Sequence, residues 1–202
     1  MNPVTTVTGT AAPLPRANVD TDQIIPKQFL KRVERSGFGE FLFFDWAADA
    51  EGELDPNFVL NRPEYSDSKI LVAGPNFGSG SSREHAPWAL EDWGFEAIIA
   101  SSFADIFKGN CAKIGLLTIE LAQDEVDMLM RIAESTPNSF TVDLASQTVS
   151  TDGFETTFDI DSFVKHCLLN GLDHVALTLE HGSQIDAFEA TRPQHRPVVS
   201  TA

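Results

Sequence analysis

The chain is organised around residues 74–94, which read GPNFGSGSSREHAPWALEDWG. A short apolar run at residues 70–73 precedes this stretch and is typical of a buried strand. Apolar residues at helical spacing follow it, from Ala86 to Trp93. Loop glycines such as Gly78 and Gly80 allow positive φ and a close approach to a ligand, and free amides at a helix start favour negative charge. A strand, a Gly/Ser loop and a helix therefore predict an anion-binding site.

Two familiar loop motifs do not match this stretch. Arg83 stands where a dinucleotide-binding loop has its third glycine, and the Gly-Lys-Ser/Thr of a P-loop is absent. A simpler interpretation is that Ser81-x-x-Glu84 is a capping box that only satisfies helix-end amides. Pro87 would then lie in the second turn, where proline deletes a hydrogen bond. The helix is therefore expected either to start nearer Pro87 or to start at Ser81 with a distortion.

Four blocks of sequence carry a family resemblance. Residues 76–90 resemble the signature of the small subunit of 3-isopropylmalate dehydratase, a relative of the aconitase swivel domain. Three further blocks, at residues 17–30, 102–110 and 170–173, resemble the same family in the same order. A lone Ser-Arg-Glu would be weak support, whereas four ordered blocks spanning roughly residues 14 to 190 are specific.

The expected fold is of the α/β class. Beyond the central motif, spacing predicts strands at 97–100 and 116–121, helices at 103–113 and 124–135, and a hairpin turning at Asp152-Gly153. Asp161 is expected to cap a helix that ends at Gly171, and a last helix is expected at 183–190. Residues 3–16 are expected to form an edge strand. Strands before and after the alternating helices predict a mixed sheet flanked by helices, and the position and prolines of residues 191–202 predict a flexible tail. The resemblance adds a single swivelling β/β/α domain over residues 1–190.

The resemblance also implies a reaction and the residues that perform it. Water is removed and re-added, which interconverts 2-isopropylmalate and 3-isopropylmalate through an enzyme-bound alkene. Ser81 matches the position of the catalytic base, and Arg83 matches a guanidinium that stabilises the alkoxide and grips a substrate carboxylate. Asp22 is grouped with them as a catalytic residue. The positions that match substrate-binding residues are Thr21, Gly80 and Ser82.

A second carboxylate clamp is expected from a basic cluster. Lys27, Lys31, Arg32 and Arg35 fall within nine residues of an acidic chain. Taken alone, such a cluster is typical of a solvated face. The neighbouring block of resemblance favours substrate binding, with Arg32 as the clamp and Lys31 as the alternative.

In aconitase-like enzymes, a four-iron four-sulfur cluster acts as a Lewis acid on the departing hydroxyl. Such a cluster needs three or more cysteine thiolates, and this chain has two cysteines, Cys111 and Cys167, in unrelated segments. Both are expected to be small buried apolar side chains. The sequence thus predicts no metal or cofactor on this chain, and a large-subunit partner that carries the cluster.

The composition of the chain disfavours several classes of partner. With 30 acidic and 14 basic residues, the net charge is −16, which disfavours nucleic acid and anionic membranes. No apolar run approaches the ~20 residues that span a bilayer, and no signal segment is recognised, so a cytoplasmic location is expected. A small dicarboxylate remains compatible, because local charges decide its binding.

Two alternative functions remain open at this point. The chain could serve a sibling hydro-lyase that acts on citraconate with methylmalate, or on homoaconitate. Apolar residues between positions 31 and 65, including Val33, Phe38 and Val59, favour a branched aliphatic substrate instead. The other alternative is a non-catalytic anion-binding module, which the joint presence of Ser81 and Arg83 disfavours.

Overall fold

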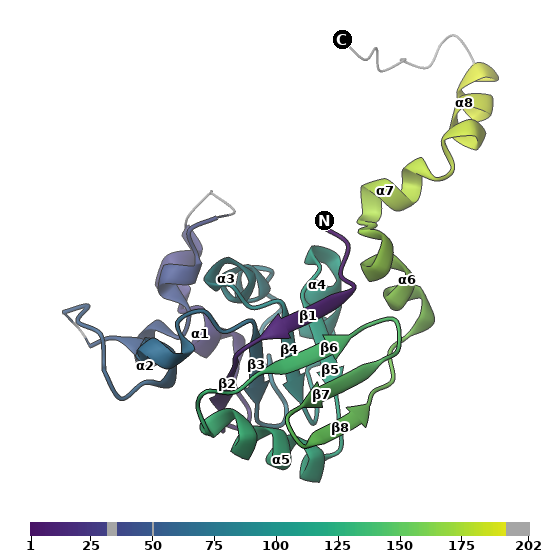
Figure 1. Cartoon of the computed structure of the whole chain (residues 1–202). Coiled ribbons are helices and arrows are strands. Elements are labelled where there is room, and N and C mark those ends of the chain that lie inside the picture. Colours follow the sequence, from purple (N-terminus) through teal and green to yellow (C-terminus); the bar gives the residue numbers. More distant parts are fainter. Residues whose placement is uncertain (32–35, 50, 193–202) are drawn as a thin grey trace.

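The computed structural model describes residues 1–31, 36–49 and 51–192 (Figure 1). The strands are β1 (Thr6–Gly9), β2 (Ala11–Leu14), β3 (Ile70–Ala73), β4 (Ala97–Ala100), β5 (Leu117–Glu120), β6 (Phe140–Asp143), β7 (Thr148–Thr151) and β8 (Phe154–Thr157). The α-helices are α1 (Thr21–Ile24), α2 (Phe44–Ala47), α3 (His85–Trp93), α4 (Asp105–Ile114), α5 (Gln123–Glu134), α6 (Ser162–Asn170), α7 (His174–Leu179) and α8 (Gly182–Ala190). The 3₁₀ helices are η1 (Lys27–Lys31), η2 (Gly39–Phe41), η3 (Val59–Asn61) and η4 (Pro63–Tyr65).

A parallel sheet forms the centre of the molecule. Its strand order is β2-β3-β4-β5, and all three pairings are parallel. Helices α3 and α4 connect β3 to β4 and β4 to β5, as parallel neighbours require. Every residue of β2, β3 and β4 is buried, as expected for a sheet covered on both faces.

A second sheet is antiparallel, with strand order β1-β6-β7-β8. The α/β class with both kinds of pairing is confirmed, but the two kinds occupy two sheets rather than one mixed sheet. The edge strand expected at residues 3–16 is also two strands, β1 and β2, which join different sheets. The predicted hairpin is confirmed, since Gly153 takes φ +80° between β7 and β8.

Alternation along the parallel strands builds two hydrophobic clusters. Successive side chains of a strand point to opposite faces. Leu71 and Ala73 of β3 therefore join a first cluster with α3 and α4, while Ile70 and Val72 join a second cluster with α5 and the antiparallel sheet. The molecule thus has three layers: helices α3 and α4, the parallel sheet, and a third layer made of α5 and the antiparallel sheet. The buried rings Phe38 and Phe43 belong to the first cluster, so the aromatic segment 37–46 contributes to the core.

Helix α3 begins at His85, three residues after Ser82. Its N-cap is Glu84, which makes no side-chain capping bond, so the capping-box interpretation of Ser81 and Glu84 is wrong, and the expectation of a helix that starts nearer Pro87 is confirmed. Pro87 lies within the first turn, where its missing N–H costs no helical hydrogen bond. The residues from Gly78 to Arg83 are therefore loop, and their side chains are not used to cap the helix.

Helices α7 and α8 extend away from the two sheets, whereas α6 lies beside them (Figure 1). Asp161 caps α6 by accepting from Phe163 N and Val164 N, and Gly171 ends it at φ +65°, so both predicted signals are confirmed. The predicted last helix is confirmed as α8, whereas α7 was not predicted. Most of the tail expected at 191–202 lies outside the described residues. No helix in the described part of the chain is long and apolar enough to cross a membrane.

Candidate active site

The candidate site lies at the carboxyl edge of the parallel sheet. The segments that follow β2, β3 and β4 meet there, and ligands of open α/β sheets bind at this edge. The Gly/Ser loop follows β3. It lies between residues 18–21, which follow β2, and residues 102–104, which follow β4.

Main-chain hydrogen bonds fix the loop on both sides. Gly78 N donates to Val19 O at 2.8 Å, and Thr21 N donates to Ser79 O at 2.9 Å. On the other side, Phe77 N donates to Ser102 O at 3.1 Å, and Ala104 N donates to Phe77 O at 3.0 Å. Backbone bonds of this kind define the loop conformation without using its serine hydroxyls.

Glycine is required at two loop positions. Gly78 and Gly80 have φ +75° and +91°, which disfavour any side chain. A Cβ at Gly78 would also overlap with the ring of Phe107. The loop therefore lies directly against the first turn of α4, whose free amides favour negative charge nearby.

A pocket of about 220 Å³ opens beside the loop. Its walls are the Gly/Ser loop, Thr21 and the first turn of α4. The predicted site residues that line it are Thr21, Gly80, Ser81, Ser82 and Arg83. Ser81 and Ser82 are exposed, so both hydroxyls are accessible. Lining by Ala104, Asp105, Ile106 and Phe107 was not predicted, although these residues belong to the block of resemblance at residues 102–110.

Thr21 contributes in a way that the sequence did not reveal. Its side chain is 2% exposed, and its Oγ1 donates to Ser81 O at 2.9 Å. The hydroxyl thus holds the main chain of Ser81. A direct contact between Thr21 and substrate remains a prediction.

Arg83 is held by Asp22 in a two-pronged ion pair. Nη1 donates to Oδ1 at 2.5 Å, and Nη2 donates to Oδ2 at 3.0 Å. The Arg83 side chain is 17% exposed and that of Asp22 is 51% exposed, so the pair lies at the pocket edge. Asp22 thus fixes the plane of the guanidinium and uses two of its five N–H groups, so a second carboxylate can bind only at the remaining N–H groups.

His85, the first residue of α3, packs between two aromatic side chains. Its ring packs against Phe38 at 5.3 Å and Trp88 at 4.9 Å between centroids. Burial lowers the pKa of His85. Glu84 opposes this shift, and Arg83 adds to it. His85 is therefore a neutral packing group at pH 7.

The basic cluster is only partly visible. Lys31 is exposed at the end of η1 and does not line the pocket formed by the described residues. Arg32, the predicted second clamp, lies outside the described residues. Its role stays a prediction.

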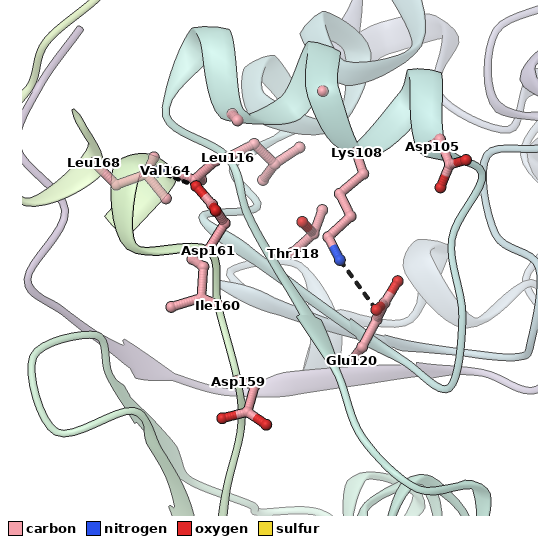
Figure 2. Close-up of a pocket in the computed structure, with 12 residues that line it drawn as sticks. Asp105, Lys108, Leu116, Thr118, Glu120, Asp159, Ile160, Asp161, Val164 and Leu168 are labelled. Atoms are coloured by element: carbon pink, nitrogen blue, oxygen red, sulfur yellow. Dashed lines mark hydrogen bonds and ion pairs between the residues drawn. The ribbon is translucent and has the colours of Figure 1, made fainter. Parts of the chain in front are cut away.

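A larger cavity than the pocket beside the loop lies between α4, β5 and α6 (Figure 2). It measures about 600 Å³, and four carboxylates line it: Asp105, Glu120, Asp159 and Asp161. Its lysine, Lys108, is already paired with Glu120 at 3.0 Å. Such a lining repels a dicarboxylate, so size alone does not identify the substrate site.

The described residues offer no fit for a metal cluster. No group of three or more His, Cys, Asp or Glu among them is arranged to hold a metal ion. Cys111 and Cys167 are both buried as free thiols, and burial raises the pKa of each. Cys111 belongs to the first hydrophobic cluster, which confirms its interpretation as a core residue.

Comparisons with known proteins agree with this geometry. The aconitase C-terminal domain model matches residues 1–124, which include the whole Ser81 loop. A model described as LeuD_N matches residues 127–162, and a model of the C-terminal domain of the 3-isopropylmalate dehydratase small subunit matches residues 175–199. The fold and the loop therefore define a domain of the aconitase C-terminal class.

Relatives that align over their full length identify one family within the aconitase C-terminal class. The chain is 59% identical to the 3-isopropylmalate dehydratase small subunit of Halalkalibacterium halodurans, over 95% of this chain and all of the relative. It is 58% identical to that of Jannaschia sp., over 98% of this chain and all of the relative. The crystal structure of 3-isopropylmalate dehydratase (LeuD) from Methanocaldococcus jannaschii has a TM-score of 0.66 at 26% identity, covering 91% of this chain and 99% of that one. The chain belongs to the family of 3-isopropylmalate dehydratase small subunits, which are subunits of a hydro-lyase.

Proposed function

We propose that this chain supplies the proton-transferring and carboxylate-binding groups of a hydro-lyase that interconverts 2-isopropylmalate and 3-isopropylmalate in leucine biosynthesis. The observation that carries the proposal is the placement of Ser81 and Arg83 on one pocket edge, with Arg83 already oriented by Asp22. The small dicarboxylate substrate would bind with one carboxylate against Arg83. Ser82, Gly80 and the amides at the start of α4 would contact the same end of the substrate.

Ser81 acts as the base. It takes the proton from the carbon next to the hydroxyl-bearing carbon, the C–O bond breaks, and an alkene forms. Water is then added back in the opposite sense, with the hydroxyl on the carbon that lost the proton and the proton from Ser81 on the carbon that lost the hydroxyl, which gives the isomer. A serine hydroxyl is a weak acid, so its alkoxide needs stabilisation by the Arg83 guanidinium and the loop amides.

The hydroxyl must also have an acceptor when it leaves. An iron–sulfur cluster on a large subunit would supply that Lewis acid, since the two cysteines of this chain are too few to hold one. The active enzyme is then a complex of the two subunits, with the Ser81 pocket facing the large subunit. Both partners work in the cytoplasm in this proposal.

Reconstitution with the large subunit tests the function. We expect Ser81→Ala to reduce turnover by at least about a hundredfold and to leave complex formation unchanged, because a positioned base contributes that much. Ser139→Ala is the matched control, because Ser139 is an exposed serine next to β6 in the other sheet. Near-normal turnover of Ser81→Ala would contradict the assignment.

A panel of substituted malates tests the choice of substrate. Preference of the reconstituted enzyme for a methyl- or carboxymethyl-substituted malate would assign the chain to a sibling hydro-lyase.

A further inference from the structure

The C-terminal arm, defined here as α7 (His174–Leu179) and α8 (Gly182–Ala190), consists of two short helices that do not pack into either hydrophobic cluster. Neither helix contains a buried residue. Isolated helices shorter than about 12–15 residues are marginal in water, and protein helices gain most of their stability by burying an apolar face. Within the described part of the chain, neither length nor burial stabilises the helices of the arm. They therefore need another surface to pack against.

The arm exposes the apolar side chains that such a surface would cover. Val175, Leu179 and Phe188 are 67%, 68% and 66% exposed. Val175 and Leu179 lie one helical turn apart and share a face. Phe163 of α6, just before the arm, is 60% exposed as well. Single exposed apolar residues are ordinary, but their concentration on one extended element marks an interaction surface.

The arm begins beside the active-site loop. A pocket of about 250 Å³ is lined by Glu84 and Trp88 on one side and by Asp173, His174 and Val175 on the other. Glu84 directly follows Arg83. Val175, the first of the exposed apolar residues of the arm, thus lies on the same pocket as Glu84, at the end of the loop that the proposed function places against the large subunit.

The family models separate the arm from the catalytic part. The aconitase C-terminal model ends at residue 124, whereas the arm is matched by a model that describes the C-terminal domain of the small subunit of 3-isopropylmalate dehydratase. The arm is therefore characteristic of chains that work as separate small subunits. A separate subunit needs contacts that hold it to its partner.

We propose that the C-terminal arm docks on the large, cluster-bearing subunit, with Val175, Leu179 and Phe188 as its apolar anchors. The inference rests on the proposed function, because it takes the large subunit as the partner. The recognised surface on that partner is an apolar groove, since the anchors are aliphatic and aromatic. Docking orders α7 and α8 and strengthens the complex without touching the reacting atoms.

The test uses the full chain carrying Val175→Ser, Leu179→Ser and Phe188→Ser together. We expect the Kd for the large subunit to rise about a hundredfold, since three apolar side chains lose their burial. The kcat at saturating large subunit should remain that of the unaltered chain. Met128→Ser is the control, because Met128 is an exposed apolar residue of α5 that lies outside the arm and does not line the Ser81 pocket. Ser81→Ala should give the opposite pattern, an unchanged Kd and a lost kcat, so the two proposals fail separately.

Hydrogen exchange gives a second readout that needs no variant. Amides of α7 and α8 should exchange rapidly in the free chain and slowly in the complex. An unchanged Kd for the triple variant, or arm amides that exchange equally fast in both states, would overturn the proposal. Self-association of the free chain that the triple variant abolishes, with affinity for the large subunit unchanged, would assign the surface to a second copy and overturn it too.

Discussion

Three consecutive residues serve the site in three different ways. Asp20 caps α1 by accepting from Gln23 N at 2.8 Å, and the Gln23 side chain accepts from Asp20 N in return. Thr21 bonds to the main chain of Ser79 and Ser81. Asp22 projects outward to pair with Arg83. A single short helix thus positions both the base and the guanidinium of the proposed mechanism.

Thr21→Val removes the hydroxyl and keeps the shape of the side chain. The carbonyl of Ser81 then loses its donor, which we expect to lower the free energy of unfolding by about 1 kcal/mol. Misalignment of Ser81 should reduce kcat by roughly tenfold in the reconstituted enzyme, because small displacements of a catalytic group are costly. Thr21→Ser retains the donor and should keep most of the rate. A Thr21→Val enzyme with unchanged kcat and a raised KM would instead support direct substrate contact.

His85 makes stability depend on pH. Its pKa is lowered in the folded state by burial, so the unfolded chain binds the proton more tightly. The free energy of unfolding should therefore fall as the pH drops below about 6.5, the ordinary histidine pKa. Urea unfolding at pH 8 and pH 5.5 should show a larger loss for the unaltered chain than for His85→Gln, which does not titrate. An equal loss in both would rule out His85 as the source.

At the scale of elements, the site depends on how α4 meets the loop after β3. Phe77 and Phe107 pack edge to face at 5.5 Å, and Gly78 leaves room for the Phe107 ring. The first turn of α4 thereby becomes a wall of the pocket that contains Ser81. Packing between a helix and a loop, rather than any single hydrogen bond, sets the width of the pocket.

Gly78→Ala tests this packing. The added methyl group has both an unfavourable φ and an overlap with Phe107, so we expect a loss of several kcal/mol in the free energy of unfolding. Gly153→Ala is the matched control, because Gly153 has a similar φ of +80° with open space around its Cβ position. That variant should lose only about 1 kcal/mol. Comparable losses in thermal or urea unfolding would show that Phe107 moves away easily.

At the scale of the whole molecule, one sheet connects the two hydrophobic clusters. Alternate residues of β2, β3 and β4 face α3 and α4 on one side, and α5 and the antiparallel sheet on the other. Neither cluster can be exposed without opening strands that the other also needs. We therefore expect residues 1–170 to unfold as one cooperative unit, as predicted for a single domain.

Alkylation of the Cys111 thiol measures whether the domain unfolds as one cooperative unit. Burial on α4 raises the pKa of its thiol well above the usual value, so the reactive thiolate is not formed in the folded state. In a Cys167→Ser background, alkylation of Cys111 should require unfolding. The free energy derived from its labelling rate should equal that from urea unfolding. A clearly smaller value would mean that α4 opens on its own and would contradict a single unit.

Local sequence signals predicted much of the fold. Asp161 and Gly171 identified the ends of α6, and Asp152-Gly153 identified the β7–β8 turn, because caps and tight turns depend on a few neighbouring residues. The same local logic failed at Ser81-x-x-Glu84. That tetrad fits a capping box, but the loop is held by β-like hydrogen bonds to residues 19–21, and the helix starts later.

The sequence by itself determined strands β3, β4 and β5, the two ends of α6 and the Gly/Ser loop with its serine and arginine, since backbone preferences and side-chain periodicity act over a few residues. Only the tertiary structure decided that β1 and β2 join different sheets, and that Asp22 meets Arg83 across 61 positions. Strand pairing and side-chain contacts at such separations depend on how complete elements pack. Local spacing does not encode that packing.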